Sequence, residues 1–192
     1  MRFSHLKCIV IGVICVFASG LMTTTSAGPW FKHRFGELRA YHGDWLNVCE
    51  DGGAGQCRTV QTYVGSGKDR FFGESKLSVY IEHNDRVSVE VYDMGMPALT
   101  GASLRFDFGD QIISVPADQW RIGARDAENV AETVFIPPSE ISTRLVTLIR
   151  AKARLKVTYP LHGADSGIAP FSLRGSNAAI AALKTHMATR RP

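Results

Sequence analysis

The sequence predicts an all-β fold, an antiparallel β-sandwich-like domain with one internal and one C-terminal short helix. Two segments in the middle of the chain alternate apolar and polar residues on both sides of short polar turns, which is the pattern of β-hairpins. Alternation with one apolar face is typical of antiparallel sheets, whereas parallel strands are apolar on both faces. Clear helical spacing of apolar residues occurs in two late segments, after residues 138 and 175.

Residues 1–27 have the features of a cleaved export signal. Arg2 and Lys7 precede an apolar run at residues 8–20, which is shorter than the roughly 20 residues that an uncleaved membrane anchor needs. Small residues lead up to Ala27, so we expect cleavage after Ala27. The sequence therefore predicts a periplasmic or secreted protein.

The chain that remains after cleavage is expected to hold one domain. Residues 28–39 form a lead-in without a clear period, residues 40–188 form the β domain, and residues 189–192 form a frayed tail. Loss of Arg2 and Lys7 lowers the net charge from +4 to +2, which argues against a nucleic-acid partner because nucleic-acid-binding proteins carry a concentrated basic surface. After the signal, no apolar run is long enough to predict a transmembrane segment.

The mature chain would keep two cysteines, Cys49 and Cys57. An even pair in an exported protein is typical of a disulfide, and residues 50–56 have the composition of a turn that brings two strand ends together. A redox site favours Cys-x-x-Cys at a helix start, and a zinc site needs two further ligands. We therefore interpret the pair as a structural disulfide.

The first strands are expected on either side of this disulfide. Residues 40–48 predict one strand that ends at Cys49, and residues 57–64 predict its partner. Because alternate residues of a strand share a face, Trp45 would lie with Tyr41 and would close over the next hairpin from the opposite sheet.

Two hairpins follow. The first has a polar turn at residues 83–85, and the second turns at Gly109 and Asp110. The alternating apolar positions of the first hairpin are Leu77, Val79, Ile81, Val87, Val89 and Val91. Those of the second are Leu104, Phe106, Phe108, Ile113 and Val115. Each hairpin is expected to bury one face.

The last third of the domain contains both predicted helices. Ser139 is placed to cap the first helix and Ser176 to cap the second, while residues 154–159 and 169–174 predict strands. The apolar positions at helical spacing are Ile141, Leu145, Leu148 and Ile149 in the first helix and Ile180, Leu183 and Met187 in the second.

Sequence patterns of several common chemistries do not occur. Residues 65–68 resemble a phosphate-binding loop, but its first glycine is missing and Asp69 stands where the motif needs serine or threonine. There is no Gly-x-Ser-x-Gly elbow, and the histidines lack the helical spacing of a metal site. Arg154 and Lys156 share one strand face, which we interpret as solvated. We therefore expect no catalytic, cofactor-binding or metal-binding residues and no cofactor.

Paired carboxylates leave one catalytic interpretation open, because glycan cleavage needs only two placed acids. Asp126, Glu128 and Glu132 cluster in a polar stretch where a solvated loop is expected. Asp44 is adjacent to Trp45, and a carboxyl group held against an indole has a raised pKa when it loses water. The alternative, which we prefer, is that Trp45 belongs to the core and Asp44 accepts bonds from nearby backbone donors.

Gly43, Asp44 and Trp45 stand before the two cysteines, and Gly175 stands between the last predicted strand and the last predicted helix. With these motifs, both ends of the domain resemble the invasion-associated locus B family. Members begin with a Gly-Asp-Trp motif followed by two cysteines, here Gly43, Asp44, Trp45, Cys49 and Cys57. They close with a strand, a glycine and a short helix, and residues 171–183 are similar, with Gly175 as the glycine. The likeness covers about residues 40–185. It implies structural roles for the motif residues and assigns no catalytic residue.

The chain departs from that family in one respect. Family members carry a second cysteine pair in the later half, whereas residues 119–123 lie in that region without a cysteine. The chain therefore resembles a divergent member. The resemblance implies an exported bacterial protein, and the founding members are linked to entry into host cells.

Three functions are compatible with these observations. The leading hypothesis is a non-enzymatic domain that binds a protein or cell-envelope partner, with a link to host-cell invasion or envelope maintenance. The second is a hydrolase of cell-wall glycan that uses buried carboxylates such as Asp44 or Glu132. The third is a structural envelope factor without a discrete ligand. A cleft with two facing carboxylates favours the enzyme, and an exposed apolar or aromatic patch favours the binder.

Overall fold

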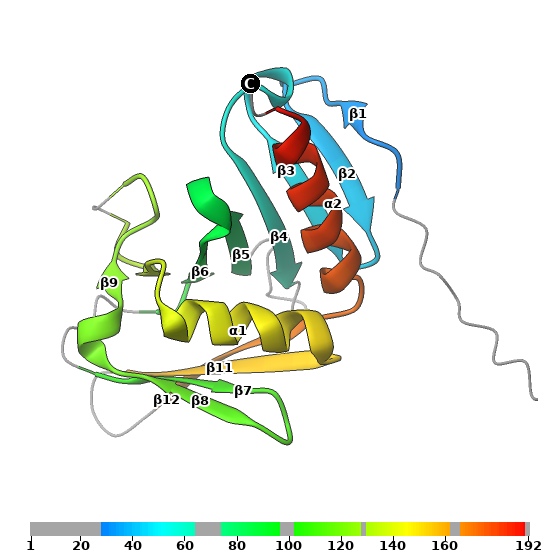
Figure 1. Ribbon diagram of the computed structural model, residues 1–192. Coiled ribbons are helices and arrows are strands. Elements are labelled where there is room, and N and C mark those ends of the chain that lie inside the picture. Colours follow the sequence, from blue (N-terminus) through cyan, green and yellow to red (C-terminus); the bar gives the residue numbers. More distant parts are fainter. Residues whose placement is uncertain (1–27, 64–73, 97–101, 128–129, 162–165, 191–192) are drawn as a thin grey trace, which may run out of the picture.

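Figure 1 shows the computed structural model, which describes residues 28–63, 74–96, 102–127, 130–161 and 166–190. The predicted export signal and the loop at residues 65–69 lie outside these residues. The described part contains two antiparallel sheets and two α-helices, which confirms the predicted all-β class. Neither of these helices is long and apolar enough to span a membrane.

The larger sheet has the strand order β1-β2-β3-β4-β5-β6-β10-β9. Its strands are β1 (Phe31–Lys32), β2 (Leu38–His42), β3 (Trp45–Cys49), β4 (Cys57–Tyr63), β5 (Ser75–Ile81), β6 (Val87–Asp93), β9 (Arg121–Ile122) and β10 (Thr133–Ile136). The smaller sheet has the order β12-β11-β7-β8. Its strands are β7 (Leu104–Asp107), β8 (Ile112–Val115), β11 (Arg154–Pro160) and β12 (Ser166–Ser172). The helices are α1 (Glu140–Ala151) and α2 (Ser176–Thr189).

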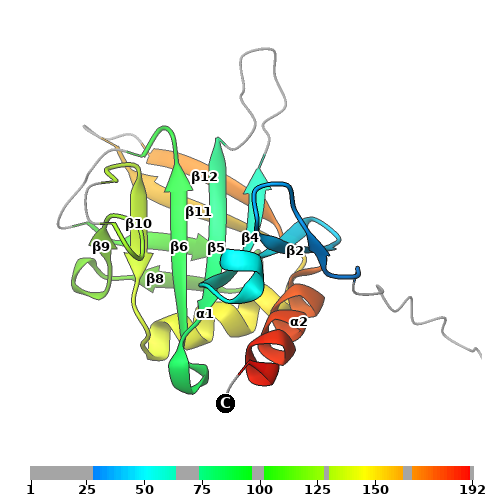
Figure 2. The same cartoon turned by 90° about the horizontal axis from the view of Figure 1, so that it is seen from above.

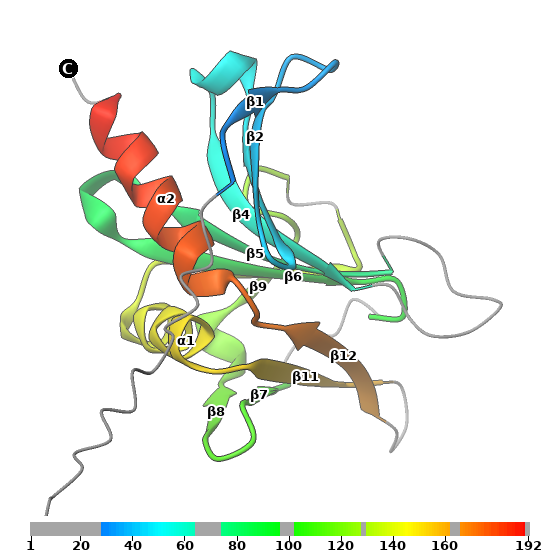
Figure 3. The same ribbon diagram turned by 90° about the vertical axis from the view of Figure 1, so that its right-hand side faces the viewer.

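The two sheets pack face to face, and their strands cross steeply (Figure 2). Both helices lie on the same side of the larger sheet as the smaller sheet does (Figure 3). Helix α1 packs on β6, and α2 covers β2, β3 and β4. The core fills the space between these layers, and the opposite face of the larger sheet is directed outward.

The two predicted hairpins are confirmed. In the first, β5 pairs with β6 and Val79 lies opposite Val89. In the second, β7 pairs with β8 and Phe106 lies opposite Ile113. The first hairpin differs from expectation on its outward face, where Tyr80 is also buried, because neighbouring strands and the chain after β9 cover it.

The prediction of one strand at residues 40–48 is wrong. The segment forms a hairpin of β2 and β3, and Gly43 turns the chain with a φ of +61°. This turn places Tyr41 outward, with 56% of its surface exposed, while Trp45 is fully buried. β3 also belongs to the same sheet as β5 and β6, so Trp45 faces the smaller sheet instead of facing the hairpin across the core.

The ends of several elements differ from expectation. The predicted lead-in contains β1 and the start of β2, so it supplies the edge of the larger sheet. Strand β12 begins at Ser166, three residues early, and β10 had no sequence signal because all four of its residues are buried. The predicted frayed tail begins at Thr189, but that residue is the last of α2.

Ser139 caps α1 as predicted, and its Oγ accepts a hydrogen bond from the Ser142 N–H at 3.1 Å. Ser176 does not cap α2. The N-cap is Gly175, with a φ of +94°, and the Ser176 hydroxyl donates instead to the Ile149 carbonyl at 2.6 Å, which ties α2 to α1.

Candidate functional site

The two segments that carry the family resemblance meet in space. The Asp44 N–H donates to the Arg174 carbonyl at 3.0 Å, which joins the β2–β3 turn to the start of α2. A Cβ atom added to Gly43 would lie 2.8 Å from the Arg174 oxygen, and one added to Gly175 would lie 2.0 Å from the His42 oxygen. The backbones approach this closely only because both positions are glycine.

Asp44 is held as a carboxylate at this junction. It accepts hydrogen bonds from the Ser172 hydroxyl at 2.5 Å and from the Arg174 Nε at 3.1 Å. The hydrogen bond from Arg174 lowers the pKa of Asp44, and it outweighs the opposing effect of partial burial. The raised pKa considered for Asp44 is therefore wrong, and its partners are side chains instead of the expected backbone donors.

Trp45 belongs to the core, as we preferred. Its side chain is fully buried in the main hydrophobic cluster, and its indole N–H donates to the Ser172 carbonyl at 3.1 Å. The same strand end of β12 thus anchors both Asp44 and Trp45. These contacts give the Gly-Asp-Trp segment a role in joining the two sheets.

The other candidate acids do not gather around Asp44. Asp126 is exposed and pairs with Arg125, Glu132 is exposed just before β10, and Glu128 lies outside the described residues. Two hollows of the described part of the chain are characterised below, a groove on the outward face of the larger sheet and a pocket where the two sheets meet. Neither Asp44 nor Glu132 lines either of them. The two acids named for the hydrolase hypothesis therefore share neither of these sites.

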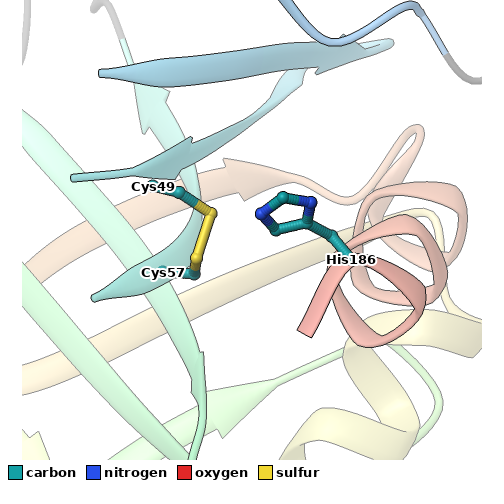
Figure 4. A group of neighbouring side chains, drawn as sticks. All are labelled: Cys49, Cys57 and His186. Carbon is teal, nitrogen blue, oxygen red and sulfur yellow. A yellow bond between two sulfur atoms is a disulfide. The ribbon is translucent and has the colours of Figure 1, made fainter. Parts of the chain in front are cut away.

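Cys49 and Cys57 form the predicted disulfide, directly opposite each other on β3 and β4 with their Cα atoms 4.1 Å apart. Figure 4 shows His186 of α2 pointing at this bond, and one ring nitrogen and the two sulfurs all lie within 4.8 Å of one another. The His186 ring also packs against Trp30 in a tilted arrangement, with 4.5 Å between ring centroids. Arg190 donates to the Cys57 Sγ at 2.9 Å.

This cluster fastens the C-terminal end of α2 to the larger sheet. Burial lowers the pKa of His186, and the nearby Arg190 guanidinium lowers it further, so the ring is neutral at pH 7. While the sulfurs are bonded to each other, neither is a thiolate, the form that binds metals. With the disulfide formed, the three residues therefore pack together as a disulfide and a neutral ring.

The outward face of the larger sheet contains a groove of about 540 Å³, which we call the outer groove. Its floor includes Leu46, Val48 and Val60, and its aromatic members are Tyr80 and Tyr92. Its charged lining residues are Glu37, Arg39, Glu50, Arg58, Lys76, Glu90, Arg125 and Asp126. An apolar floor with tyrosine, arginine and a charged rim is the composition of protein-binding surfaces.

The charged residues of the outer groove form local pairs. Arg39 donates through Nε to Glu37 at 2.7 Å, and Arg58 lies 3.5 Å from Glu50. The Lys76 ammonium group lies 5.0 Å from the centroid of the Tyr92 ring. These side chains are thereby held in defined positions on the sheet surface.

One wall of the outer groove is the chain after β9, which Arg125 fastens to the sheet. Its guanidinium donates to both carboxylate oxygens of Glu82, at 2.9 and 2.6 Å, and its backbone N–H donates to Glu90 at 2.8 Å. Burial alone would raise the pKa of Glu82, but hydrogen bonds from Arg125 and Ser88 outweigh it and lower the pKa. The wall is therefore held by charge-assisted bonds.

The outer groove was not predicted from the sequence. Its charged and aromatic residues lie on the strand faces opposite the core, and the sequence patterns predicted only that each hairpin buries one face. The available signal for a binding surface was the type of side chain. Positions that could carry small polar residues on a solvent-exposed sheet face carry large ones here, namely Arg58, Lys76, Tyr80, Glu90 and Tyr92. Only the sheet order shows that they adjoin one another.

Comparison with known proteins gives a likeness of fold. No protein-family model matches the chain, and no curated protein matches it in sequence. Among solved structures, invasion associated protein B from Bartonella henselae is similar, with a TM-score of 0.56 and 18% sequence identity. The match covers 79% of this chain and 99% of that protein. The chain therefore has a fold similar to that of invasion associated protein B.

Proposed function

We propose that this chain is an exported bacterial protein of the invasion-associated locus B type, which acts without catalysis by binding a protein partner through the outer groove. The observation that carries this proposal is the groove itself, a concave, aromatic and charged surface of about 540 Å³ on the outward face of the larger sheet. The fold likeness to invasion associated protein B supports the assignment to an invasion-associated bacterial protein.

Export is supported by the basic and apolar pattern of residues 1–27 and by the disulfide. We expect the protein in the periplasmic or secreted fraction, with Gly28 as the mature N-terminus, and intact-mass spectrometry of the fractionated protein measures both. Recovery of the full-length chain from the cytoplasm would contradict export.

The binding proposal is tested by site-specific photocrosslinking in cells. A photoreactive amino acid replaces Lys76 in the outer groove, or Arg144 on the exposed side of α1 as a matched control. We expect a defined crosslinked protein from position 76 and none from position 144. Arg125→Ala, which releases the wall of the groove, is expected to weaken the same crosslink.

Two results would refute the binding role. One is identical crosslinking from positions 76 and 144, which would indicate non-specific contact. The other is an unchanged binding affinity in the Arg125→Ala variant, which would show that partner binding does not depend on the groove.

A further inference from the structure

A second hollow lies on the other side of the molecule, where the larger and smaller sheets meet. It has a volume of about 610 Å³, within the size range of small-ligand sites. We call it the edge pocket, because Pro170, Phe171 and Ser172 contribute one side of it from β12, an edge strand of the smaller sheet. Gln61 and Tyr63 of β4 contribute the facing side.

The edge pocket contains a buried hydrogen-bond acceptor without a partner. Gln61 is only 5% exposed, and its amide nitrogen donates to the Thr62 carbonyl at 3.0 Å, which fixes the orientation of the amide. Its Oε1 atom has no hydrogen-bond partner among the described residues. A buried acceptor left without a donor costs stability, and a ligand N–H would satisfy it.

The edge pocket also carries more positive than negative charge. Arg154 and Lys156 of β11 are exposed and line it, and among the described residues neither forms a salt bridge. Asp107 is the single carboxylate that the described residues place in the lining. It lies opposite Lys156 in the pairing of β11 with β7, and it accepts hydrogen bonds from the Gly109 N–H and from Arg105, so Arg154 is left as excess positive charge. The net field in the pocket therefore attracts an anion.

Apolar side chains form a further part of the lining. Leu155, Pro170 and Phe171 adjoin the charged residues, and the half-buried Tyr63 ring lies at the β4 side. The central position of Pro170 in β12 also leaves one edge position without an N–H, which makes binding by strand addition unfavourable. A ligand is thus held by side chains instead of by an added strand.

From these features we propose that the edge pocket binds an N-acylated amino acid with a free carboxylate, the chemistry of a peptide C-terminus. The carboxylate pairs with Arg154 and Lys156, the amide N–H donates to the Gln61 Oε1, and the apolar side chain contacts Tyr63 and Pro170. This site shares no lining residue with the outer groove and is independent of the function proposed there.

Calorimetric titration of the purified mature protein tests the proposal. The probes are acetyl-Ala-Leu-Phe as the free acid and the same peptide with a C-terminal amide, which differ in the carboxylate alone. We expect the acid to bind at least about tenfold more tightly than the amide, and its affinity to fall as salt is raised from about 50 to 500 mM. Equal affinities for the two peptides would overturn the proposal, as would no binding of the acid at about 5 mM.

Variants assign the binding to this pocket. Lys156→Gln and Arg154→Gln are each expected to lower the affinity for the peptide acid about three- to tenfold. Gln61→Met, which keeps the side-chain length, is expected to lower the affinity for both peptides. Lys76→Gln, in the outer groove, is the matched charge control and should leave the affinity unchanged. A loss of affinity in Lys76→Gln equal to that in Lys156→Gln would show non-specific charge attraction and would overturn the site.

Two further probes identify the source of the ligand. Acetyl-phenylalanine binding as tightly as the tripeptide acid would support a small free acyl amino acid, and tighter binding of the tripeptide would support the end of a peptide chain. If inorganic phosphate displaces the acid completely and Gln61→Met leaves the affinity of the acid unchanged, the site is only an anion patch, and the proposal is contradicted.

Discussion

Replacement of Trp45 tests the account of the core. The indole is fully buried in the main cluster, so Trp45→Ala removes one of the largest apolar side chains from the interface between the two sheets. Deletion of a buried tryptophan side chain costs about 3–5 kcal/mol through lost transfer energy and cavity formation. The variant also leaves the Ser172 carbonyl without its indole donor, so we expect a value near the upper end of that range.

Urea denaturation of the mature protein measures this change directly. Tyr41→Ala is the matched control, because Tyr41 lies in the same hairpin with 56% of its surface exposed, and it should cost less than about 1 kcal/mol. Trp45→Phe keeps most of the ring and loses the hydrogen bond, so an intermediate cost of about 1–2 kcal/mol is expected. A Trp45→Ala protein with the wild-type midpoint would refute the assignment of the indole to the core.

Three further predictions concern the motif junction and the disulfide. Gly175→Ala is expected to lower the free energy of unfolding by more than about 2 kcal/mol, because the new Cβ would lie 2.0 Å from a carbonyl oxygen at a φ of +94°. Gly109→Ala is the control, since Gly109 has a φ of +99° and no atom within 4 Å of the new Cβ, and it should cost only about 1 kcal/mol. Equal shifts of the melting temperature in the two variants would contradict the close approach at Gly175. Asp44→Asn should cost at most about 1 kcal/mol at pH 7, since the guanidinium partner is exposed. Because the pKa of Asp44 is lowered in the folded state, its stabilising effect is present above the ordinary pKa of 3.8 and is lost as the pH falls through the folded-state pKa. The stabilities of wild type and Asp44→Asn should therefore converge on acidification. A difference in stability that grows in acid would exclude this pairing. Replacing Cys49 and Cys57 together by alanine should cost about 2.5 kcal/mol for a short closed loop, and native protein should show no maleimide-reactive thiol at either position; rapid labelling of both would contradict the disulfide.

The sequence was informative where local pattern and tertiary burial agree. The two central hairpins and the cap of α1 follow from alternation, turn composition and Ser139, since each of these signals acts over a few neighbouring residues. The disulfide was also predictable, because two cysteines flank a turn-rich stretch.

The remaining features depend on contacts between distant segments. Gly43 ends β2 because Arg174 approaches its backbone, and a glycine within an apparently alternating run does not reveal that neighbour. Gly175 replaces Ser176 as the cap of α2 because the serine hydroxyl is used by Ile149, 27 residues away in the sequence. Strand β10 is buried on both faces and lacks alternation, so its four residues carried no strand signal.

Both candidate binding sites also depend on contacts between distant segments, so neither could be located from the sequence. Lys76 and Tyr92 of the outer groove adjoin each other only through the pairing of β5 with β6. Gln61 reaches the edge pocket only because β4 packs near β12 across the two sheets. In the sequence, the charged and polar residues of both sites occupy alternate strand positions, and the apolar residues of both sites look like ordinary core positions.

The most direct test of the account is the affinity of the crosslinked partner, once purified, for two charge-reversal variants. Lys76→Glu changes the outer groove, and Arg144→Glu makes the same change of charge on the exposed side of α1. We predict that isothermal calorimetry will show at least about a tenfold loss of affinity for Lys76→Glu and wild-type affinity for Arg144→Glu, with unchanged melting temperatures for both. Wild-type affinity in a folded Lys76→Glu protein, or an equal loss in both variants, would contradict the assignment of partner binding to the outer groove.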